Sequence, residues 1–176
     1  MVEYNIGSEF EPELAFEERD AVAVVANLIE DEGEISYYSL SRVVKKRLAP
    51  ILEELYAQGK VVYHIGLASK RDVLVGEELV KFKKSHPKVK IILFETTYFP
   101  CEIKGFSESD VRRYYKVADC ADVFVHHPIN YGEDLFKTLN VTFAKSVRTV
   151  IAYGDCESSR YFYNRGYDVR YLLTLS

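Results

Sequence analysis

The stretch from Ala121 to Tyr153, ADVFVHHPINYGEDLFKTLNVTFAKSVRTVIAY, decides the fold. Its two ends are rich in β-branched and aromatic residues and predict strands over 121–127 and 148–153, whereas its middle predicts a helix over about 132–146. The pattern continues with a short helix near 158–164 and a last strand over 167–173. Strands that alternate with helices need crossover connections, so the sequence predicts an α/β fold in which helices flank a central sheet.

Toward the amino terminus the same criteria predict further strands over 61–65 and 72–75 and a long β-like stretch, IILFETTYFPCEIKGF, over 91–106. Helices are predicted over 14–30 and from Ser39 to about Leu55. Pro50 should either kink the second of these helices or mark the first turn of a further one, because proline lacks a backbone donor. The charged segment 77–90 fits either a short helix or a hairpin tip. Ser107, with Asp110 three residues later, is typical of a helix start.

Composition limits the class of protein. The chain has 176 residues, 48% hydrophobic and 28% charged, which fits one globular domain with a small additional module. No apolar run approaches the roughly 20 residues of a membrane span. Cys101, Cys120 and Cys156 lack the spacing of a disulfide framework or zinc site, and the amino terminus does not resemble a signal peptide. We therefore expect a cytoplasmic protein without a membrane partner.

The charge is distributed unevenly along the chain. The net charge is −4, but residues 1–35 contain eleven acidic residues and only one basic residue, Arg19. The remaining 16 acidic and 22 basic residues give residues 36–176 a charge of +6. Such an asymmetry fits a polyanion-binding body, for which DNA is the expected partner. The acidic segment is then either a solvated tail or a shield for the basic surface, and the shield predicts that deleting residues 1–33 strengthens DNA binding.

Asp72 and the triplet Glu102-Ile103-Lys104 form the candidate catalytic constellation. Residues two apart in a strand share a face, so Glu102 and Lys104 would project together, with the Ile103 carbonyl between them. Two carboxylates and a carbonyl suit Mg²⁺ or Mn²⁺, and a neighbouring lysine can orient an attacking water. Glu95 on the same β-like stretch is an alternative to Asp72. The pattern indicates a phosphodiester hydrolase.

The residues around this constellation resemble the PD-(D/E)XK nuclease superfamily, and within it the small DNA-repair nucleases similar to MmcB. The resemblance is carried by Lys70-Arg71-Asp72-Val73-Leu74 and by the string EIKGFSESDVRR over 102–113, and it covers roughly residues 48–150. It implies a restriction-endonuclease-like core with a mixed β-sheet, in which Asp72, Glu102 and the Ile103 carbonyl bind the metal and Lys104 is catalytic.

The resemblance has further implications for domains and partners. It places a nuclease-like domain at 48–176, behind an acidic helical extension at 1–47. It implies an additional acidic position at Glu53 or Glu54, and it makes a homodimer reasonable. The cations Arg112, Arg113 and Lys116, which follow the motif, are candidates for contacts with DNA phosphates. The function expected is metal-dependent cleavage of DNA in repair, recombination or replication.

Two other interpretations stay open. Residues 35–66 also fit a winged helix, with a turn near Pro50 and with Lys45, Lys46 and Arg47 beside DNA, which would make the protein a transcriptional regulator without catalysis. A nucleotide- or nucleoside-binding domain built on residues 123–155 is the third interpretation. That stretch lacks the glycine-rich turn that normally cradles phosphate.

Overall fold

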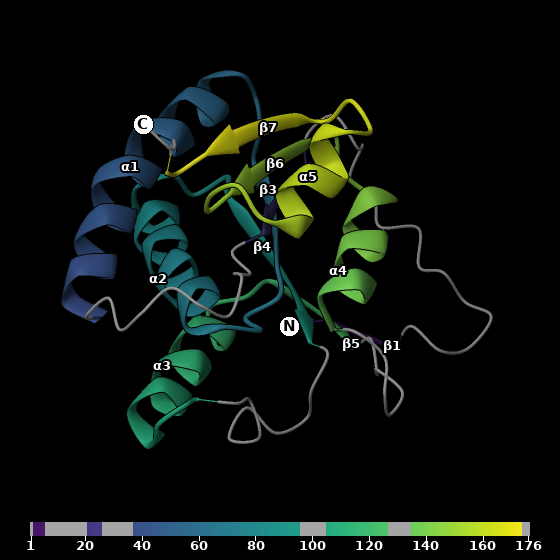
Figure 1. Cartoon of the computed structure of the whole chain (residues 1–176). Coiled ribbons are helices and arrows are strands. Elements are labelled where there is room, and N and C mark those ends of the chain that lie inside the picture. Colours follow the sequence, from purple (N-terminus) through teal and green to yellow (C-terminus); the bar gives the residue numbers. More distant parts are fainter. Residues whose placement is uncertain (1, 6–20, 26–36, 96–104, 127–134, 174–176) are drawn as a thin grey trace.

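The computed structural model of the chain describes residues 2–5, 21–25, 37–95, 105–126 and 135–173 (Figure 1). Within these ranges the chain forms seven strands and five helices. The strands are β1 (Val2–Asn5), β2 (Ala21–Val25), β3 (Val62–Ile65), β4 (Lys90–Glu95), β5 (Val123–His126), β6 (Thr149–Ala152) and β7 (Asp168–Tyr171). The helices are α1 (Tyr37–Ala57), α2 (Lys70–Ser85), α3 (Glu108–Ala118), α4 (Leu135–Ala144) and α5 (Glu157–Tyr163).

The strands form one sheet in the order β1-β5-β4-β3-β2-β6-β7, and every described pairing is parallel. The α/β class is confirmed, but the prediction of a mixed sheet is wrong. From β2 onward a helix connects each described strand to the next. Each helix returns the chain to the end of the sheet at which the preceding strand began, so the next strand runs parallel to it. The structure does not establish a restriction-endonuclease-like core.

Helices cover both faces of the sheet. Figure 1 shows α1, α2 and α3 on one side and α4 and α5 on the other. The side chains of β2 alternate between the two cores, because Val22 and Val24 pack toward α1 and α2 whereas Ala21, Ala23 and Val25 join the core beneath α4. A parallel sheet that is buried on both faces needs strands that are apolar throughout, and the fully buried strand AVAVV meets this condition.

The prediction of a helix over 14–30 is wrong for residues 21–25, which form β2. This strand lies inside the sheet, hydrogen-bonded to β3 on one side and to β6 on the other. Its small and β-branched residues suit a close-packed strand, and tertiary pairing overrides their weak helical pattern. Part of the acidic amino-terminal segment therefore lies at the centre of the fold. The expected domain boundary between residues 47 and 48 falls inside α1.

Helix α1 continues through Pro50, so the proline does not begin a second helix. The proline ring lies at an exposed position, where water can satisfy the carbonyl that loses its helical partner. The winged-helix interpretation is also wrong. It needs two helices and a wing strand, whereas residues 37–57 form one helix and β3 is an internal strand of the parallel sheet.

Most predictions carboxyl-terminal to residue 107 are confirmed. Strands β5, β6 and β7 and helices α4 and α5 lie where the alternating pattern placed them, and α3 begins at a capping box formed by Ser107 and Asp110. Segment 77–90 lies mostly in α2, so the helical alternative was correct. None of the helices in the described ranges is both long enough and apolar enough to cross a membrane.

His64 on β3 is a buried histidine at the centre of the sheet. Its side chain lies beside Phe94, with 5.1 Å between ring centroids, and Nδ1 is 3.2 Å from the Ser146 hydroxyl. Among the described atoms, Nε2 has no hydrogen-bond partner. Burial lowers the pKa of this imidazole to about 4, because the charged form would lose its hydration.

We expect acid to destabilise the fold through His64. Between pH 6.5 and about 4 the unfolded chain binds a proton that the folded chain does not, so the free energy of unfolding falls as the pH falls, by about 3 kcal/mol over this window. Asp110 and Asp122, whose pKa values are lowered, lose their contributions only below this window. Urea unfolding at pH 7, 6, 5 and 4.5 should show the slope. His64→Leu should flatten it, and an unchanged slope in this variant would contradict the assignment.

Candidate functional site

Asp72 lies in the first turn of α2, so the predicted strand at 72–75 is wrong. The backbone N–H of Asp72 donates to the Ser69 hydroxyl oxygen at 3.2 Å, and the same hydroxyl donates to the Asp72 carboxylate at 2.9 Å. This cap satisfies orphan donors at the start of the helix, and the carboxylate is favourably placed near the positive end of the helix dipole. The cap at Ser69 outweighs the β propensity of Val73 and Val75.

The other members of the predicted metal set are not assembled in the described residues. Glu102, Ile103 and Lys104 lie outside them. Glu95 ends β4 and accepts a hydrogen bond from the Tyr114 hydroxyl at 3.1 Å. Glu54 is an exposed residue of α1 that pairs with Arg170 on β7 at 2.9 Å. Within the described residues, no three His, Cys, Asp or Glu side chains gather in a group that could hold a metal ion.

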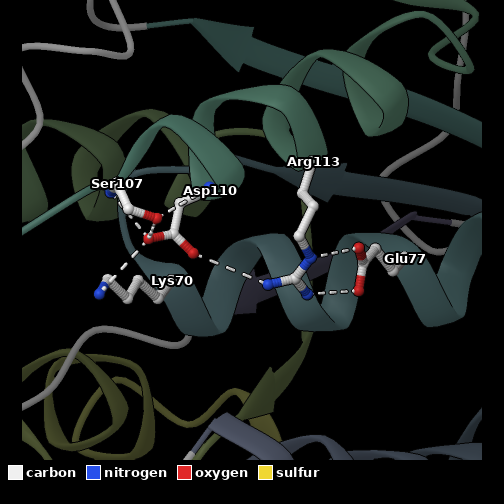
Figure 2. Close-up of polar contacts among 5 residues, drawn as sticks. All are labelled: Lys70, Glu77, Ser107, Asp110 and Arg113. Carbon is white, nitrogen blue, oxygen red and sulfur yellow. Dashed lines mark hydrogen bonds and ion pairs between the residues drawn. The ribbon is translucent and has the colours of Figure 1, made fainter.

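The predicted DNA-binding cations of α3 differ in their surroundings. Arg113 forms a bidentate pair with Glu77 of α2, at 2.8 and 2.6 Å, and lies 3.8 Å from Asp110 (Figure 2). Its guanidinium therefore joins α2 to α3. Arg112 and Lys116 are exposed, and Arg112 lies 3.8 Å from Glu108. Arg112 and Lys116 are thus exposed to solvent, whereas Arg113 stabilises the packing of α3 against α2.

The same network contains Lys70, which lies 3.4 Å from the Asp110 carboxylate. Burial raises the pKa of the Glu77 carboxyl, because the charged form is partly desolvated. At Asp110 burial acts in the same direction, but hydrogen bonds from Ser107 and the charge of Lys70 outweigh it, so the pKa of this carboxyl lies below its usual value. The charged side chains of this network therefore lie between α2 and α3.

We expect Arg113→Met to cost about 2 kcal/mol of stability, because the pair with Glu77 is partly buried and the variant leaves the carboxylate without its partner. Arg112→Met, which removes an exposed arginine from the same helix, should cost less than about 0.5 kcal/mol. Urea unfolding measures both values. Adding Glu77→Gln to Arg113→Met should restore part of the loss. Equal costs for the two arginine variants would show that the interhelical pair does not stabilise the fold.

The order of the strands identifies where a ligand site is expected. From β2 the chain builds outward through β3, β4 and β5, and it then returns to place β6 on the other side of β2. The helix after β2 lies on one face and the helix after β6 lies on the other (Figure 1). In open parallel sheets this change of direction leaves a crevice at the carboxyl ends of the two strands, and ligands bind there.

A cavity lies beside this switch point. Its free volume is about 10 Å³, roughly the room that one water molecule needs. Its walls come from the end of β2, from the turn after β3, from the start of α2 and from the inner face of α4; the lining residues are Val24, Val25, Gly66, Asp72, Phe136, Leu139, Asn140 and Phe143. The cavity thus combines apolar and aromatic walls with one carboxylate and one amide.

The polar groups of the cavity are held in place by buried partners. Asp72 is 5% exposed and is positioned by the Ser69 cap. Asn140 is also 5% exposed, and its amide nitrogen donates to the hydroxyl of Ser158 on α5 at 2.6 Å. This bond links α4 to the helix that follows β6. Both polar side chains are therefore oriented before any ligand arrives.

The turn between β3 and α2 is shaped for close packing. A Cβ at Gly66 would lie 2.8 Å from a terminal methyl of Leu139 on α4, so a larger residue here would force that side chain to shift. Leu67 follows with a φ of 47° and is fully buried. A non-glycine residue in this left-handed region is strained by about 1–2 kcal/mol. Such strain occurs preferentially at ligand sites, and this turn borders the cavity.

Arg71 places a cation near the same edge of the sheet. It is 7% exposed, and its guanidinium carbon lies 4.6 Å from the centre of the Tyr153 ring. Tyr153 directly follows β6, so the contact joins the start of α2 to the switch-point strand. A buried guanidinium at this position can attract an anionic group of a ligand.

Sequence reasoning selected Asp72 but missed Gly66 and Asn140. A signal for the turn was present, because Gly66 follows a buried strand and precedes the Ser69-x-x-Asp72 helix start. No local signal marks Asn140, which reaches the cavity only through the packing of α4. No protein-family model and no curated protein matches the chain, so the candidate site rests on its geometry.

Proposed function

We propose that the protein binds a nucleotide or a nucleoside in the cavity at the carboxyl ends of β2 and β3. The observation that carries this proposal is the position of Asp72 and Asn140, two buried and oriented polar side chains in an otherwise apolar cavity beside the topological switch point. Doubly wound parallel sheets bind nucleotides in this crevice, outside the carboxyl ends of the strands.

The chemistry of the cavity fits the parts of such a ligand. Phe136 and Phe143 offer aromatic surface to a base, and the Asp72 carboxylate can accept hydrogen bonds from ribose hydroxyls. Its negative charge disfavours a phosphate at the start of α2, so the phosphate is expected toward Arg71 and Tyr153. The free volume of about 10 Å³ is far below the roughly 300 Å³ of the smallest usual ligand pockets. The walls of the cavity would therefore have to move apart to admit a base or a ribose.

The proposal is tested by thermal unfolding of the full chain with a panel of ligands. The panel contains adenosine, AMP, ADP, GMP and UMP, with ribose 5-phosphate and inorganic phosphate as controls. A nucleotide at 100 times its dissociation constant should stabilise the fold by about 2.7 kcal/mol and raise Tm by about 5–11 °C. The proposal fails if no nucleoside or nucleotide raises Tm at 1 mM, or if inorganic phosphate alone does so equally.

Metal-dependent DNA cleavage stays a prediction from the sequence. It needs a metal held jointly by Asp72 or Glu95 and by Glu102, with Lys104 as catalytic lysine. Of these residues the structure describes only Asp72, on α2, and Glu95, on β4. Both lie near the carboxyl ends of the strands. Mg²⁺ or Mn²⁺, a DNA substrate and a homodimer belong to that prediction, and no described contact favours it over ligand binding in the cavity.

A further inference from the structure

The outer face of α1 carries four exposed cations in one group, Arg42, Lys45, Lys46 and Arg47, which we call the α1 basic patch. None of them forms an ion pair with any residue that the structure describes. Residues 42 to 47, which are separated by five steps of 1.5 Å, span only about 7.5 Å along the helix axis. The patch is therefore a dense positive surface without an ion-pair partner among the described residues.

The stretch of sequence that contains the patch has no acidic residue of its own. Between residues 35 and 52 the chain contains these four basic residues and no acidic residue, whereas Glu34 precedes this stretch and Glu53 follows it. Arg42 and Lys46 are four apart and Arg42 and Lys45 three apart, spacings at which like charges destabilise a helix by a few tenths of a kcal/mol per pair. Some other cations of the fold are matched with acids, such as Lys83 with Asp122. The α1 basic patch lowers helix stability and has no ion-pair partner among the described residues.

We propose that the α1 basic patch binds the phosphate backbone of double-stranded DNA. A polyanion supplies negative charge that the described residues do not bring to the patch, and neutralising phosphates releases their counterions. An anionic membrane would also attract the cations, but helices that lie on membranes insert large apolar side chains. From residue 41 onward the described side chains of α1 include no exposed large hydrophobic residue. The patch is thus suited to phosphates rather than to a lipid surface.

This surface is separate from the proposed nucleotide site. The apolar side of α1, which includes Val44, Leu48 and Leu52, packs into the core, and the patch faces the opposite way. None of its residues lines the cavity. DNA binding and nucleotide binding can therefore each be present or absent independently of the other.

The test measures how salt weakens binding of the full chain to a fluorescent 30-base-pair duplex in EDTA, by anisotropy. If each cation neutralises one phosphate, the slope of log K against log salt is about −3.6, and affinity falls about 150-fold between 50 and 200 mM salt. Lys45→Gln/Lys46→Gln should reduce the slope to about −1.8 and the loss to about 12-fold. Circular dichroism checks that the variant is folded.

The matched control is Lys84→Gln/Lys88→Gln, which removes the same charge from two exposed lysines. Lys84 lies at the carboxyl end of α2, and Lys88 lies just beyond it. This control should keep the wild-type slope. The proposal is overturned if the control changes the slope as much as Lys45→Gln/Lys46→Gln, or if the wild type does not bind the duplex at 50 mM salt. It is also overturned if Lys45 and Lys46 are needed for binding to phosphatidylserine vesicles but not to DNA.

Discussion

A chain that lacks residues 1–33 is expected to lose its folded structure instead of binding DNA more tightly. The deletion removes β1 and β2, and β2 is hydrogen-bonded on both sides inside the sheet. All five residues of β2 are buried, and three of them are valines. Burying these side chains stabilises the fold by more than about 5 kcal/mol, a large part of the stability of a typical domain.

Circular dichroism and urea unfolding of the truncated chain check this expectation. The matched control keeps every strand and removes charge only, through Glu30→Gln, Asp31→Asn, Glu32→Gln and Glu34→Gln. It should fold like the wild type, and it is also the proper test of whether the acidic segment shields a basic surface. A truncated chain that unfolds cooperatively, with the stability of the full chain, would contradict the central position of β2.

The fold could be predicted best where local signals agree with the tertiary structure. Strands β5 to β7 alternate with helices at short intervals, and the capping box of Ser107 marks the start of α3. Prediction failed where one segment carried two patterns. Residues 21–25 lie in a run of helix formers, and only their pairing with β3 and β6 makes them a strand. At 72–75 the valines suggested a strand, although the cap at Ser69 decides for a helix.

The candidate site was predictable only in part, for a topological reason. The sequence indicated that Asp72 carries chemistry, and its cap shows why an acid stands there. The contacts of Arg71 with Tyr153 and of Asn140 with Ser158 join segments 82 and 18 residues apart. No local sequence pattern specifies these contacts, because they form only after β6 has been placed on the other side of β2 from β3.

Asp72→Asn is expected to weaken nucleotide binding about 10- to 100-fold. Hydrogen bonds to a charged group contribute about 1.5–3 kcal/mol, and a neutral amide in place of the carboxylate loses most of that strength. The variant keeps the size of the side chain, so the cavity keeps its shape. It also removes a favourable charge from the first turn of α2, which costs about 1 kcal/mol or less of stability.

Asp110→Asn is the matched control for this experiment. Asp110 stands at the same place in a second Ser-x-x-Asp helix start, where the Ser107 hydroxyl lies 2.8 Å from its carboxylate, and it is buried to a similar degree. It does not line the cavity. Because Asp110 also pairs with Lys70, its replacement should cost at least as much stability as that of Asp72. A loss of binding confined to Asp72→Asn therefore cannot be a consequence of instability.

The most direct measurement is isothermal titration of the wild type, Asp72→Asn and Asp110→Asn with the nucleotide that raises Tm most. The nucleotide-site proposal predicts one site per chain, an affinity lowered at least tenfold in Asp72→Asn, and an unchanged affinity in Asp110→Asn. Equal affinities for all three proteins, or an equal loss in both variants, would contradict a ligand site at the carboxyl ends of β2 and β3.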